Sequence, residues 1–478
     1  MGLNIFCTEF SYLDNDLFLR MDVDYIDISK ELFNTNNYKF LNEFIIGNIE
    51  TGKSIKRKDY NNKPSKYAHL VVRNIKDGKI NCNNLIYLNE EKGEKLRPYE
   101  IKKGDIIIAI SSNVGASFYF INEIEGIQLT LSHYLTKLRV DERKLNPKLL
   151  VFYLNSRLMK KYFRSVETGK TVKNLAKNYI SNLPILLPES LDEQKKILEL
   201  IEIIDTEITT LKSQIKDPIE IINNIFSEEF NFDITKFENL KNESSYCLSL
   251  SNFSRNIDLR FSFKFHRNAG KFVQNSLNEI TSKKIKDFLE EPIKLGKGIS
   301  PKDYDKMGDN FYISMADIKK WRFEPNDAKK VSQGFFLKNT NKEIKKNDII
   351  LARSGEGTIG KVAIIDKEYK GIYSDFTMRI RLKDYNHWFA YYYFRSQFFQ
   401  YLVFIYKKGL GNNTNIFPSQ ISEFPLIDIP IPEQDRIVKK INLEINKQNK
   451  ILDDINNKNE KISEILETMI FKSHRIKF

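Results

Sequence analysis

A glycine-rich segment in the second half of the chain has the residues that could hold phosphate groups. Gly355-Glu-Gly-Thr-Ile-Gly-Lys361 fits the pattern G-x4-G-K, in which backbone amides and a lysine bind the phosphates of a nucleotide. The pattern also requires Ser or Thr at the next position, to hold Mg²⁺, and this chain has Val362 there. A helix should follow such a loop, whereas Val362-Ala-Ile-Ile365 favours a strand. We therefore predict no nucleotide site, but a tight glycine turn between strands that brings Arg353, Ser354 and Lys361 to a surface.

Other catalytic patterns are weak. The five histidines are scattered and form no H-E-x-x-H pair. Glu90-Glu-Lys92 and Glu368-Tyr-Lys370 supply the E-x-K half of a nuclease-type metal site, but neither recurs in the other half of the chain. Cys7, Cys82 and Cys247 are too far apart for a C-x-x-C motif. We predict no catalytic residue and no metal site in this chain.

Basic and amide side chains gather instead in turn-like, glycine-containing segments of both halves. Lys and Arg neutralise phosphates, while Arg and Asn can pair with two groups of a base edge at once. Any one of these residues could equally be an ordinary solvated side chain, but the repeated clusters and the net charge of +13 favour contact with DNA. The candidate DNA-binding residues are Lys53, Lys56, Arg57, Asn113, Lys170, Lys173, Asn174, Lys297, Lys302, Arg353, Ser354, Lys361, Lys407, Lys408, Asn412 and Asn413.

The two halves of the chain contain the same segments in the same order. Gly52–Tyr60 returns as Gly296–Tyr304, an offset of 244 residues, and Ile101–Ala109 returns as Ile344–Ala352, an offset of 243. Glu193-Gln194 returns as Glu433-Gln434, an offset of 240. Ordered matches at a nearly constant offset predict a tandem duplication of a unit about half as long as the chain.

Each repeat has a globular part and a helical part. Within 40–190 and 285–430, short runs rich in Ile, Val, Tyr and Phe alternate with Gly, Asn and Asp turns, which predicts strands. One or two helices are expected near 146–163 and 386–406. The globular parts are therefore predicted to be mixed α and β.

A long helix is predicted after each globular part. Apolar residues there follow steps of four and three, the 3.5-residue period of a coiled-coil seam. We expect the helices 193–230, kinked at Pro218, and 433–472 to pair antiparallel; packing of each helix on its own globular part alone is the alternative. The predicted seam residues are Ile197, Ile201, Ile204, Ile208, Leu211, Ile215, Ile441, Ile445, Leu452, Ile455, Ile462 and Leu466, with the polar Gln448 and Asn459 as register markers.

Length and composition limit the other classes. A chain of 478 residues is too long for one compact core. Charged residues make up 29% and the mean hydropathy is −0.44, and we find no apolar run that could span a bilayer. The N-terminal residues carry acidic side chains where a secretory signal would be basic. We therefore expect a cytoplasmic protein.

Taken in this order, the motifs resemble the specificity subunit of type I restriction-modification enzymes. Each half has an arginine-containing opening segment, Leu19–Tyr25 and, more weakly, Leu259-Arg-Phe-Ser, followed by G-x-x-I-x-x-x-x-Y and I-K-x-x-D-I-[IL]. I-S-x-[LF]-P and E-Q follow before the long helix, and Pro430–Val438 is close to the family's strongest local signature. The resemblance covers roughly residues 17–475. The first copy has Ser190-Leu-Asp-Glu-Gln194 in place of the compact Pro-Glu-Gln and lacks the arginine found at 353, so the two copies should read different half-sites.

The resemblance implies an α+β fold, a tandem duplication of a mixed α/β target-recognition domain with a long helix after each copy. Its domains would be 1–190 (recognition domain 1), 191–230 (central helix), 231–255 (linker), 256–431 (recognition domain 2) and 432–478 (distal helix). In that family the two domains read the two halves of a split double-stranded DNA sequence, and the helices act as ruler and docking surface. Two methyltransferase subunits bring S-adenosylmethionine and methylate adenine, and restriction subunits bring ATP hydrolysis, Mg²⁺ and cleavage. The chain itself is then expected to bind no cofactor.

Two other functions stay open at this point. A scaffold of a phage-defence complex that does not read sequence predicts salt-insensitive DNA affinity without sequence preference. A metal-dependent nuclease predicts DNA cleavage by the purified chain alone.

Overall fold

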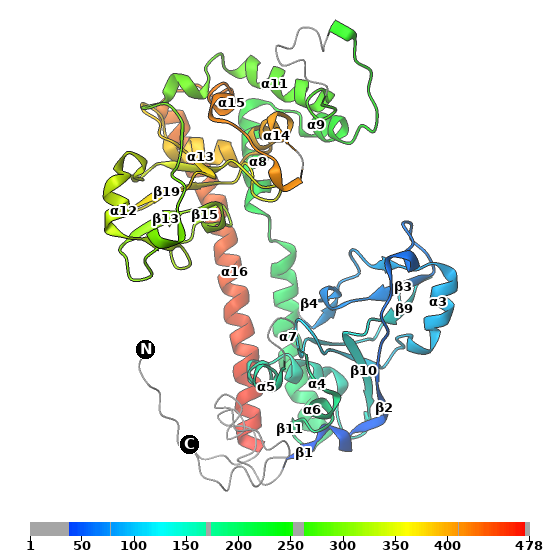
Figure 1. Cartoon of the computed structure of the whole chain (residues 1–478). Helices are drawn as coiled ribbons and strands as arrows, with labels where there is room; N and C mark the ends of the chain where they lie inside the picture. The colour runs from blue at the N-terminus through cyan, green and yellow to red at the C-terminus, as the bar shows by residue number, and fades with distance from the viewer. Residues whose placement is uncertain (1–37, 77, 169–173, 252–261, 410, 474–478) are drawn as a thin grey trace. The chain divides into compact units, whose positions relative to one another are not determined.

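The computed structural model describes residues 38–76, 78–168, 174–251, 262–409 and 411–473. These residues form two compact units. Unit 1 holds the described residues up to Gln214 and those from Asp453 onward, and unit 2 holds Ile215–Leu452. Each unit therefore contains one part of the long helix α16 (Ile431–Ser473; Figure 1).

Unit 1 is built on a four-stranded sheet in the order β2-β10-β7-β8, with every neighbouring pair antiparallel. A three-stranded sheet, β6-β3-β9, pairs β3 antiparallel with β6 and parallel with β9. All four residues of β7 are fully buried, as the apolar run in the sequence predicts. The strands of unit 1 are β1 (Lys39–Phe40), β2 (Ile45–Thr51), β3 (Tyr67–Leu70), β4 (Ile75–Lys76), β5 (Lys79–Ile80), β6 (Ile86–Tyr87), β7 (Ile106–Ala109), β8 (Ser117–Tyr119), β9 (Gln128–Leu131), β10 (Leu135–Val140) and β11 (Pro184–Ile185).

Unit 2 repeats this arrangement. Its four-stranded sheet has the order β12-β20-β17-β18, again antiparallel throughout, and its three-stranded sheet, β16-β13-β19, again has one antiparallel and one parallel pair. The same order and directions in both units confirm the predicted duplication. The strands of unit 2 are β12 (Lys294–Leu295), β13 (Asn310–Ile313), β14 (Ile318–Lys319), β15 (Arg322–Phe323), β16 (Lys329–Val331), β17 (Ile349–Ala352), β18 (Val362–Ile364), β19 (Gly371–Tyr373) and β20 (Thr377–Ile380).

Helices occupy equivalent places in the two units. The predicted helical segments 146–163 and 386–406 each form two consecutive helices, α4 with α5 and α13 with α14. Every helix in the described ranges is too short or too polar to cross a lipid bilayer. The helices are α3 (Glu90–Leu96), α4 (Pro147–Leu154), α5 (Arg157–Val166), α6 (Lys177–Ser181) and α7 (Leu191–Ser213) in unit 1, and α8 (Pro218–Phe230), α9 (Ile234–Lys241), α11 (Asn268–Ile280), α12 (Gln333–Lys338), α13 (His387–Arg395), α14 (Gln397–Tyr406) and α15 (Pro418–Ser422) in unit 2.

The predicted helix 193–230 is two helices, α7 and α8, separated by Gln214–Asp217. Pro218 is the first residue of α8, where its missing N–H costs no hydrogen bond, and the side chain of Asp217 accepts from the N–H of Ile219 at 2.7 Å. Pro218 thus begins a helix, and the prediction of one kinked helix was wrong. The predicted linker 231–255 also contains structure, since α9 packs against α11 (Figure 1).

Helix α16 pairs antiparallel with α7 in unit 1 and with α8 in unit 2. Lys458 forms an ion pair with Glu207 of α7 at 2.7 Å in unit 1, and Arg436 forms one with Glu229 of α8 at 2.5 Å in unit 2. Within unit 2, Gln448 contacts Lys216 and Arg436 contacts Glu229, so the later α16 residue pairs with the earlier partner, as an antiparallel arrangement requires. In unit 2, Gln448 accepts a hydrogen bond from the N–H of Lys216 at 2.9 Å, so this polar residue of the predicted seam joins α16 to the segment that precedes α8.

Most of the predicted seam is buried. Nine of the twelve residues have at most 9% of their surface exposed, and Leu211 is half-buried. Ile215 and Leu452 are 39% and 43% exposed and are the least buried of the twelve. Ile215 lies in the gap between α7 and α8, where no helix holds it against a partner. The buried nine are Ile197, Ile201, Ile204, Ile208, Ile441, Ile445, Ile455, Ile462 and Leu466.

The glutamine of the repeated Glu-Gln motif joins each long helix to its own globular part. Gln194 is 1% exposed; its Oε1 accepts from the N–H of Asn146, the N-cap of α4, at 2.7 Å, and its Nε2 donates to the carbonyl of Pro188. Gln434 repeats both bonds, with Asn386, the N-cap of α13, and with Ile429. The Glu-Gln motif is thus structural in both copies.

The aspartate of the repeated I-K-x-x-D motif is structural as well. Asp348 is 1% exposed and accepts two hydrogen bonds from the guanidinium of Arg381, both at 2.7 Å, and one from the N–H of Lys345. Asp105 is 3% exposed and holds Arg139 at 2.6 Å in the same way. These ion pairs fix the turn before β7 to β10, and the turn before β17 to the residue that directly follows β20.

Candidate nucleic-acid interface

Three loops of unit 2 are joined at one end of its four-stranded sheet. The first, Arg353–Gly360, connects β17 to β18; the second is the turn Ser374–Phe376 between β19 and β20. Arg353 links them, because its N–H donates to the carbonyl of Phe376 at 3.0 Å and its Nε donates to the carbonyl of Asp375 at 2.8 Å. The third is the pair Lys408 and Asn415, which bridge each other, and Asn415 also bridges Ser354. We call this the three-loop surface of unit 2.

Unit 1 has the same construction. The loop Ile110–Gly115 follows β7, and the N–H of Ile110 donates to the carbonyl of Tyr134 in the turn Ser132–Tyr134 at 2.9 Å. Asn174 bridges both Thr168 and Ser111, as Asn415 does with Lys408 and Ser354 in unit 2. These segments are the three-loop surface of unit 1. Ile110 stands in the place of Arg353, so the two surfaces share a backbone plan and differ in side chains.

The first basic residue of each predicted cluster lies beside these surfaces. Lys53 forms a parallel bridge with Ser132, and Lys297 forms one with Ser374; both lysines are exposed. Gly52 and Gly296, which precede them, leave no room for a side chain, since an added Cβ would lie 2.1 Å from the carbonyl oxygens of Leu131 and Tyr373 respectively. The glycines thus allow the close approach that places the lysines.

The other predicted residues have varied environments. Lys56, Arg57 and Lys302 are exposed on the short 3-10 turns that follow, and Asn113 is exposed in the loop after β7. Asn174, Lys408 and Asn413 are exposed at the third loop, and Ser354 is buried in a bridge with Asn415. Lys170 and Lys173 lie outside the described residues, as does the side chain of Asn412.

Lys407 is positioned as a structural residue. Its side chain is 8% exposed and its Nζ lies 3.1 Å from Glu356, whose other carboxylate oxygen accepts from the hydroxyl of Thr414 at 3.0 Å. The hydrogen bond from Lys407, and next that from Thr414, lower the pKa of Glu356. This ion pair ties the first loop of unit 2 to the third, which makes Lys407 a weaker candidate for phosphate contact than its exposed neighbour Lys408.

The glycine turn after β17 is confirmed, but the prediction that it brings Ser354 to a surface was wrong, because Ser354 is buried; Arg353 and Lys361 are half-buried. Gly355 and Gly360 have φ of +84° and +86°, a backbone conformation that favours glycine, and the segment leads directly into strand β18. The carbonyl of Lys361 accepts from the N–H of Ala352 at 2.9 Å, which closes the turn. A strand therefore stands where a phosphate-binding loop would begin a helix.

The turn between the two sheets is the part of the surface that sequence patterns missed. It comprises Ser132–Tyr134 in unit 1 and Ser374–Phe376 in unit 2 and contains no Lys, Arg or Asn. A signal was available, because Ser-x-aromatic recurs at an offset of 242 residues just before β10 and β20.

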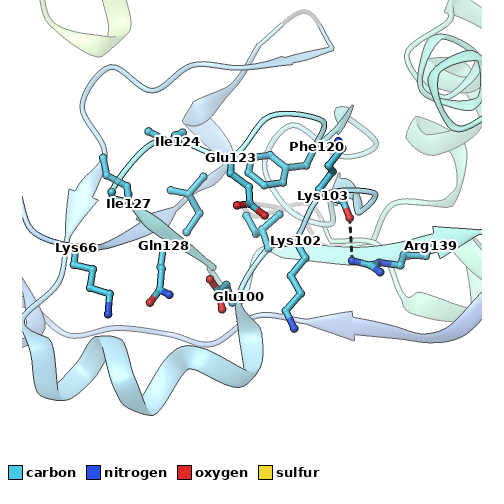
Figure 2. Close-up of a pocket in the computed structure, with 13 residues that line it drawn as sticks. Lys66, Glu100, Lys102, Lys103, Phe120, Glu123, Ile124, Ile127, Gln128 and Arg139 are labelled. Atoms are coloured by element: carbon cyan, nitrogen blue, oxygen red, sulfur yellow. Dashed lines mark hydrogen bonds between the residues drawn. The ribbon is translucent and has the colours of Figure 1, made fainter.

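A separate hollow of about 710 Å³ lies in unit 1. Figure 2 shows Glu100, Glu123 and Gln128 gathered between Lys66 and Lys102 in it. Charges of both signs thus line the hollow, and no predicted DNA-binding residue in the described ranges is among its lining residues.

Two copies of one α+β plan, each with its own three-loop surface, define the class as a tandem-duplicated recognition protein. Residues 35–221 and 278–464, more than half of the chain, match the model of the family described as "Type I restriction modification DNA specificity domain". The chain belongs to this family, as a specificity subunit with two copies of the domain.

Individual relatives carry the same description. A protein of Methanocaldococcus jannaschii named "Putative type I restriction enzyme MjaX specificity subunit" is 27% identical over 159 residues, 33% of this chain and 36% of that protein. The chain thus aligns with about a third of the length of that curated relative.

Solved structures cover most of the chain at low identity. The S subunit of a type I restriction-modification system from M. genitalium is 13% identical, with a TM-score of 0.40, over 91% of this chain and 96% of that one. The HsdS subunit from Thermoanaerobacter tengcongensis is 14% identical, with a TM-score of 0.31, over 91% and 96%. A structure described as "Structural basis underlying complex assembly and conformational transition of the type I R-M system" is 13% identical, with a TM-score of 0.46, over 92% and 97%.

Proposed function

We propose that this specificity subunit reads a bipartite DNA sequence, one half-site with the three-loop surface of unit 1 and the other with that of unit 2. The observation that carries the proposal is the identical backbone plan of the two surfaces with different side chains on each, such as Ile110 against Arg353. A shared plan suits docking on the same kind of ligand, and different side chains suit different base sequences. The exposed Lys53 and Lys297 beside the surfaces suit the phosphates that flank each half-site.

Methylome sequencing of a host that expresses the chain with its methyltransferase subunits tests this proposal. We expect one split, adenine-methylated motif with a spacer of fixed length. Replacing the loop Arg353–Gly360 and the turn Ser374–Phe376 by the corresponding segments of unit 1 should change one half of the motif only. No methylated motif, or a continuous one, would contradict the proposal. Sequence-independent binding would favour the scaffold, and metal-dependent cleavage by the chain alone would favour the nuclease.

We further propose that the subunit docks two methyltransferase subunits through equivalent points on its helices. Ile203 on α7 and Leu443 on α16 are 60% and 58% exposed, and they lie 240 residues apart, the offset that also separates Gln194 from Gln434. Large apolar side chains this exposed at matched positions suit burial by two copies of one partner. S-adenosylmethionine, ATP and Mg²⁺ would bind to partner subunits, restriction subunits included, and the complex would act on DNA in the cytoplasm.

Charge substitutions test the docking proposal. Ile203→Glu and Leu443→Glu should each reduce the methyltransferase content of the purified complex from two copies to one, as measured by light scattering, and the double variant should retain none. Ile215→Glu is the control, because Ile215 is 39% exposed and its counterpart at the same offset, Ile455, is buried. Two copies retained by both single variants would refute docking at these points.

A further inference from the structure

The turn at the centre of each three-loop surface is held rigidly by its backbone. In unit 2, Lys297 bridges Ser374 on one side, and on the other Arg353 donates hydrogen bonds to the carbonyls of Asp375 and Phe376 at 2.8 and 3.0 Å. The N–H of Thr377 donates to the carbonyl of Ser374 at 3.0 Å and closes the turn. The three carbonyls of the turn are therefore occupied, and the side chains of Asp375 and Phe376 are available to a ligand.

The serine of each turn is buried, whereas the aromatic side chain at its end faces solvent. Phe376 is 49% exposed, and its counterpart Tyr134 in unit 1 is 42% exposed. A large aromatic side chain is thus presented at the same place in both copies, although burial in the protein would be more favourable by about 1.5–3 kcal/mol for a side chain of this kind. The recurrence in both copies indicates that a ligand covers the ring.

Asp375 has the charge that a phosphate-binding surface would avoid. It is partly exposed and lies next to Gly298, where an added Cβ would be 3.2 Å from Oδ2, and its carboxylate has no ion-pair partner among the described residues. Beside Lys297 and Arg353, a free carboxylate weakens attraction to the DNA backbone. It gains only from a ligand group that donates hydrogen bonds, and on duplex DNA such groups are the exocyclic amines of the bases.

The corresponding residue of unit 1 has different chemistry. His133 takes the place of Asp375, is exposed, and lies against Tyr134 with ring centroids 3.8 Å apart. An imidazole can donate to a purine acceptor, which a carboxylate cannot. The two turns thus keep the aromatic side chain and change the polar one, as expected of elements that read different bases from the same position.

We propose that the turns Asp375-Phe376 and His133-Tyr134 are the base-reading elements of the two units. Asp375 accepts a hydrogen bond from the N4 amino group of a cytosine in the major groove, while Phe376 packs against an adjoining base; His133 and Tyr134 do the same work on the other half-site with a different base. This inference rests on the proposed function, since it names residues that would read the half-sites.

The test uses the full chain in complex with its methyltransferase subunits. Methylation of a randomised DNA library gives the preference at every position of the motif. Asp375→Asn should lower the discrimination at one position of one half-site about tenfold, because a well-placed base contact contributes about that factor. Phe376→Ala should weaken the same half-site, and His133→Ala should relax only the other one. Asp366→Asn is the control, since Asp366 is an exposed acid beyond the opposite end of β18.

The outcomes distinguish a failure of the proposed function from a failure of base reading by the turn. If the wild-type complex shows no bipartite motif, the proposed function fails, and this inference with it. If the wild-type complex reads a bipartite motif but Asp375→Asn and Phe376→Ala change no position more than twofold, base reading by the turn is wrong while the proposed function stands. Circular dichroism and the melting temperature should match wild type, since no side-chain hydrogen bond of Asp375 is described that the substitution would remove.

Discussion

Asp105 and Asp348 show how a repeated polar residue can serve the fold. The I-K-x-x-D motif that helped to detect the duplication contains an acid that is 1–3% exposed and bonded to an arginine in or directly after the neighbouring strand. Burial of a charge is tolerated only when it is paired and hydrogen-bonded, and both conditions are met here. The motif therefore identifies the fold, and the ligand-facing residues have to be sought elsewhere.

Removing the Asp348 carboxylate should destabilise unit 2. We expect Asp348→Ala to lower the free energy of unfolding by about 3 kcal/mol, because Arg381 would lose the carboxylate that accepts two of its hydrogen bonds. Urea denaturation of the intact chain measures the effect. Asp327→Ala is the control and should cost at most about 1 kcal/mol, since the side chains of its ion pair with Lys319 are 67% and 49% exposed. Equal effects of the two substitutions would contradict this role.

His69 makes unit 1 sensitive to pH. It is fully buried in β3 against the hydroxyl of Thr130, and burial, followed by the charges of His133 and Lys92, lowers its pKa to about 4. The unfolded chain binds this proton near pH 6.5. Stability from this group is therefore complete above about pH 6.5 and falls as the pH drops towards 4.

The expected loss is about 1.4 kcal/mol between pH 7.5 and 5.5. Denaturation of wild type at the two pH values measures it, and His69→Gln should abolish the difference whereas His387→Gln should not. In unit 2, Glu229 responds at a lower pH than His69, because Arg436 and Lys440 hold the pKa of Glu229 at about 2. The stability that this ion pair contributes is therefore lost as the pH falls below about 4.5. A pH dependence unchanged in His69→Gln would show that other groups are responsible.

At the scale of elements, the sequence predicted the strands and helices whose apolar residues recur at a regular period. It missed features that depend on a single contact or on where a helix ends. The buried strands β7 and β17, the paired helices and the glycine turn before Lys361 follow from apolar runs, a 3.5-residue period and β-branched residues. The end of α7 at Ser213 does not, because apolar residues continue in the same period across the gap. The pairing of Lys407 with Glu356 depends on two loops about 50 residues apart, which no local pattern records.

Under the proposed function, the gap between α7 and α8 changes how helix length should affect the spacer between the two half-sites. On sequence alone, four residues inserted after Ser213 would be expected to lengthen a continuous helix by about 6 Å, or one to two base pairs. Since α7 ends at Ser213 while α16 is continuous, we now expect the non-helical Gln214–Asp217 segment to absorb that insertion and leave the spacer unchanged.

The matched experiment adds four residues after Lys450 in α16 together with four after Ser213. Under the proposed function, this double insertion should lengthen the spacer by one or two base pairs and leave both half-sites unchanged, as read by methylome sequencing. A four-residue step in a 3.5-residue repeat can be absorbed by local unwinding. A longer spacer with the first insertion alone, or none with both, would show that α16 does not set the distance.

Under the proposed function, charge should govern the affinity of the whole complex for DNA. Binding of the assembled complex to its DNA should fall steeply with salt, with a slope of about −0.9 per phosphate contact. The double variant Lys53→Ala, Lys297→Ala should reduce the magnitude of that slope by about 2, because both lysines are exposed beside the three-loop surfaces. Fluorescence anisotropy at several salt concentrations measures the slope, with Lys319→Ala as the control. A slope unaffected by the double variant would place the phosphate contacts elsewhere.

The division of α16 between the units also has a consequence for synthesis on the ribosome. Unit 1 includes Ile455, Ile462 and Leu466 of α16, which are buried like Ile201, Ile204 and Ile208 of α7, and Lys458 of α16 pairs with Glu207 of α7. These α16 residues emerge about 250 residues after those of α7. At roughly 5–20 residues per second, α7 waits some 12–50 s with its apolar stripe uncovered while all of unit 2 is translated. The first unit to leave the ribosome is therefore completed last, and a nascent chain stalled within unit 2 exposes a surface that chaperones bind.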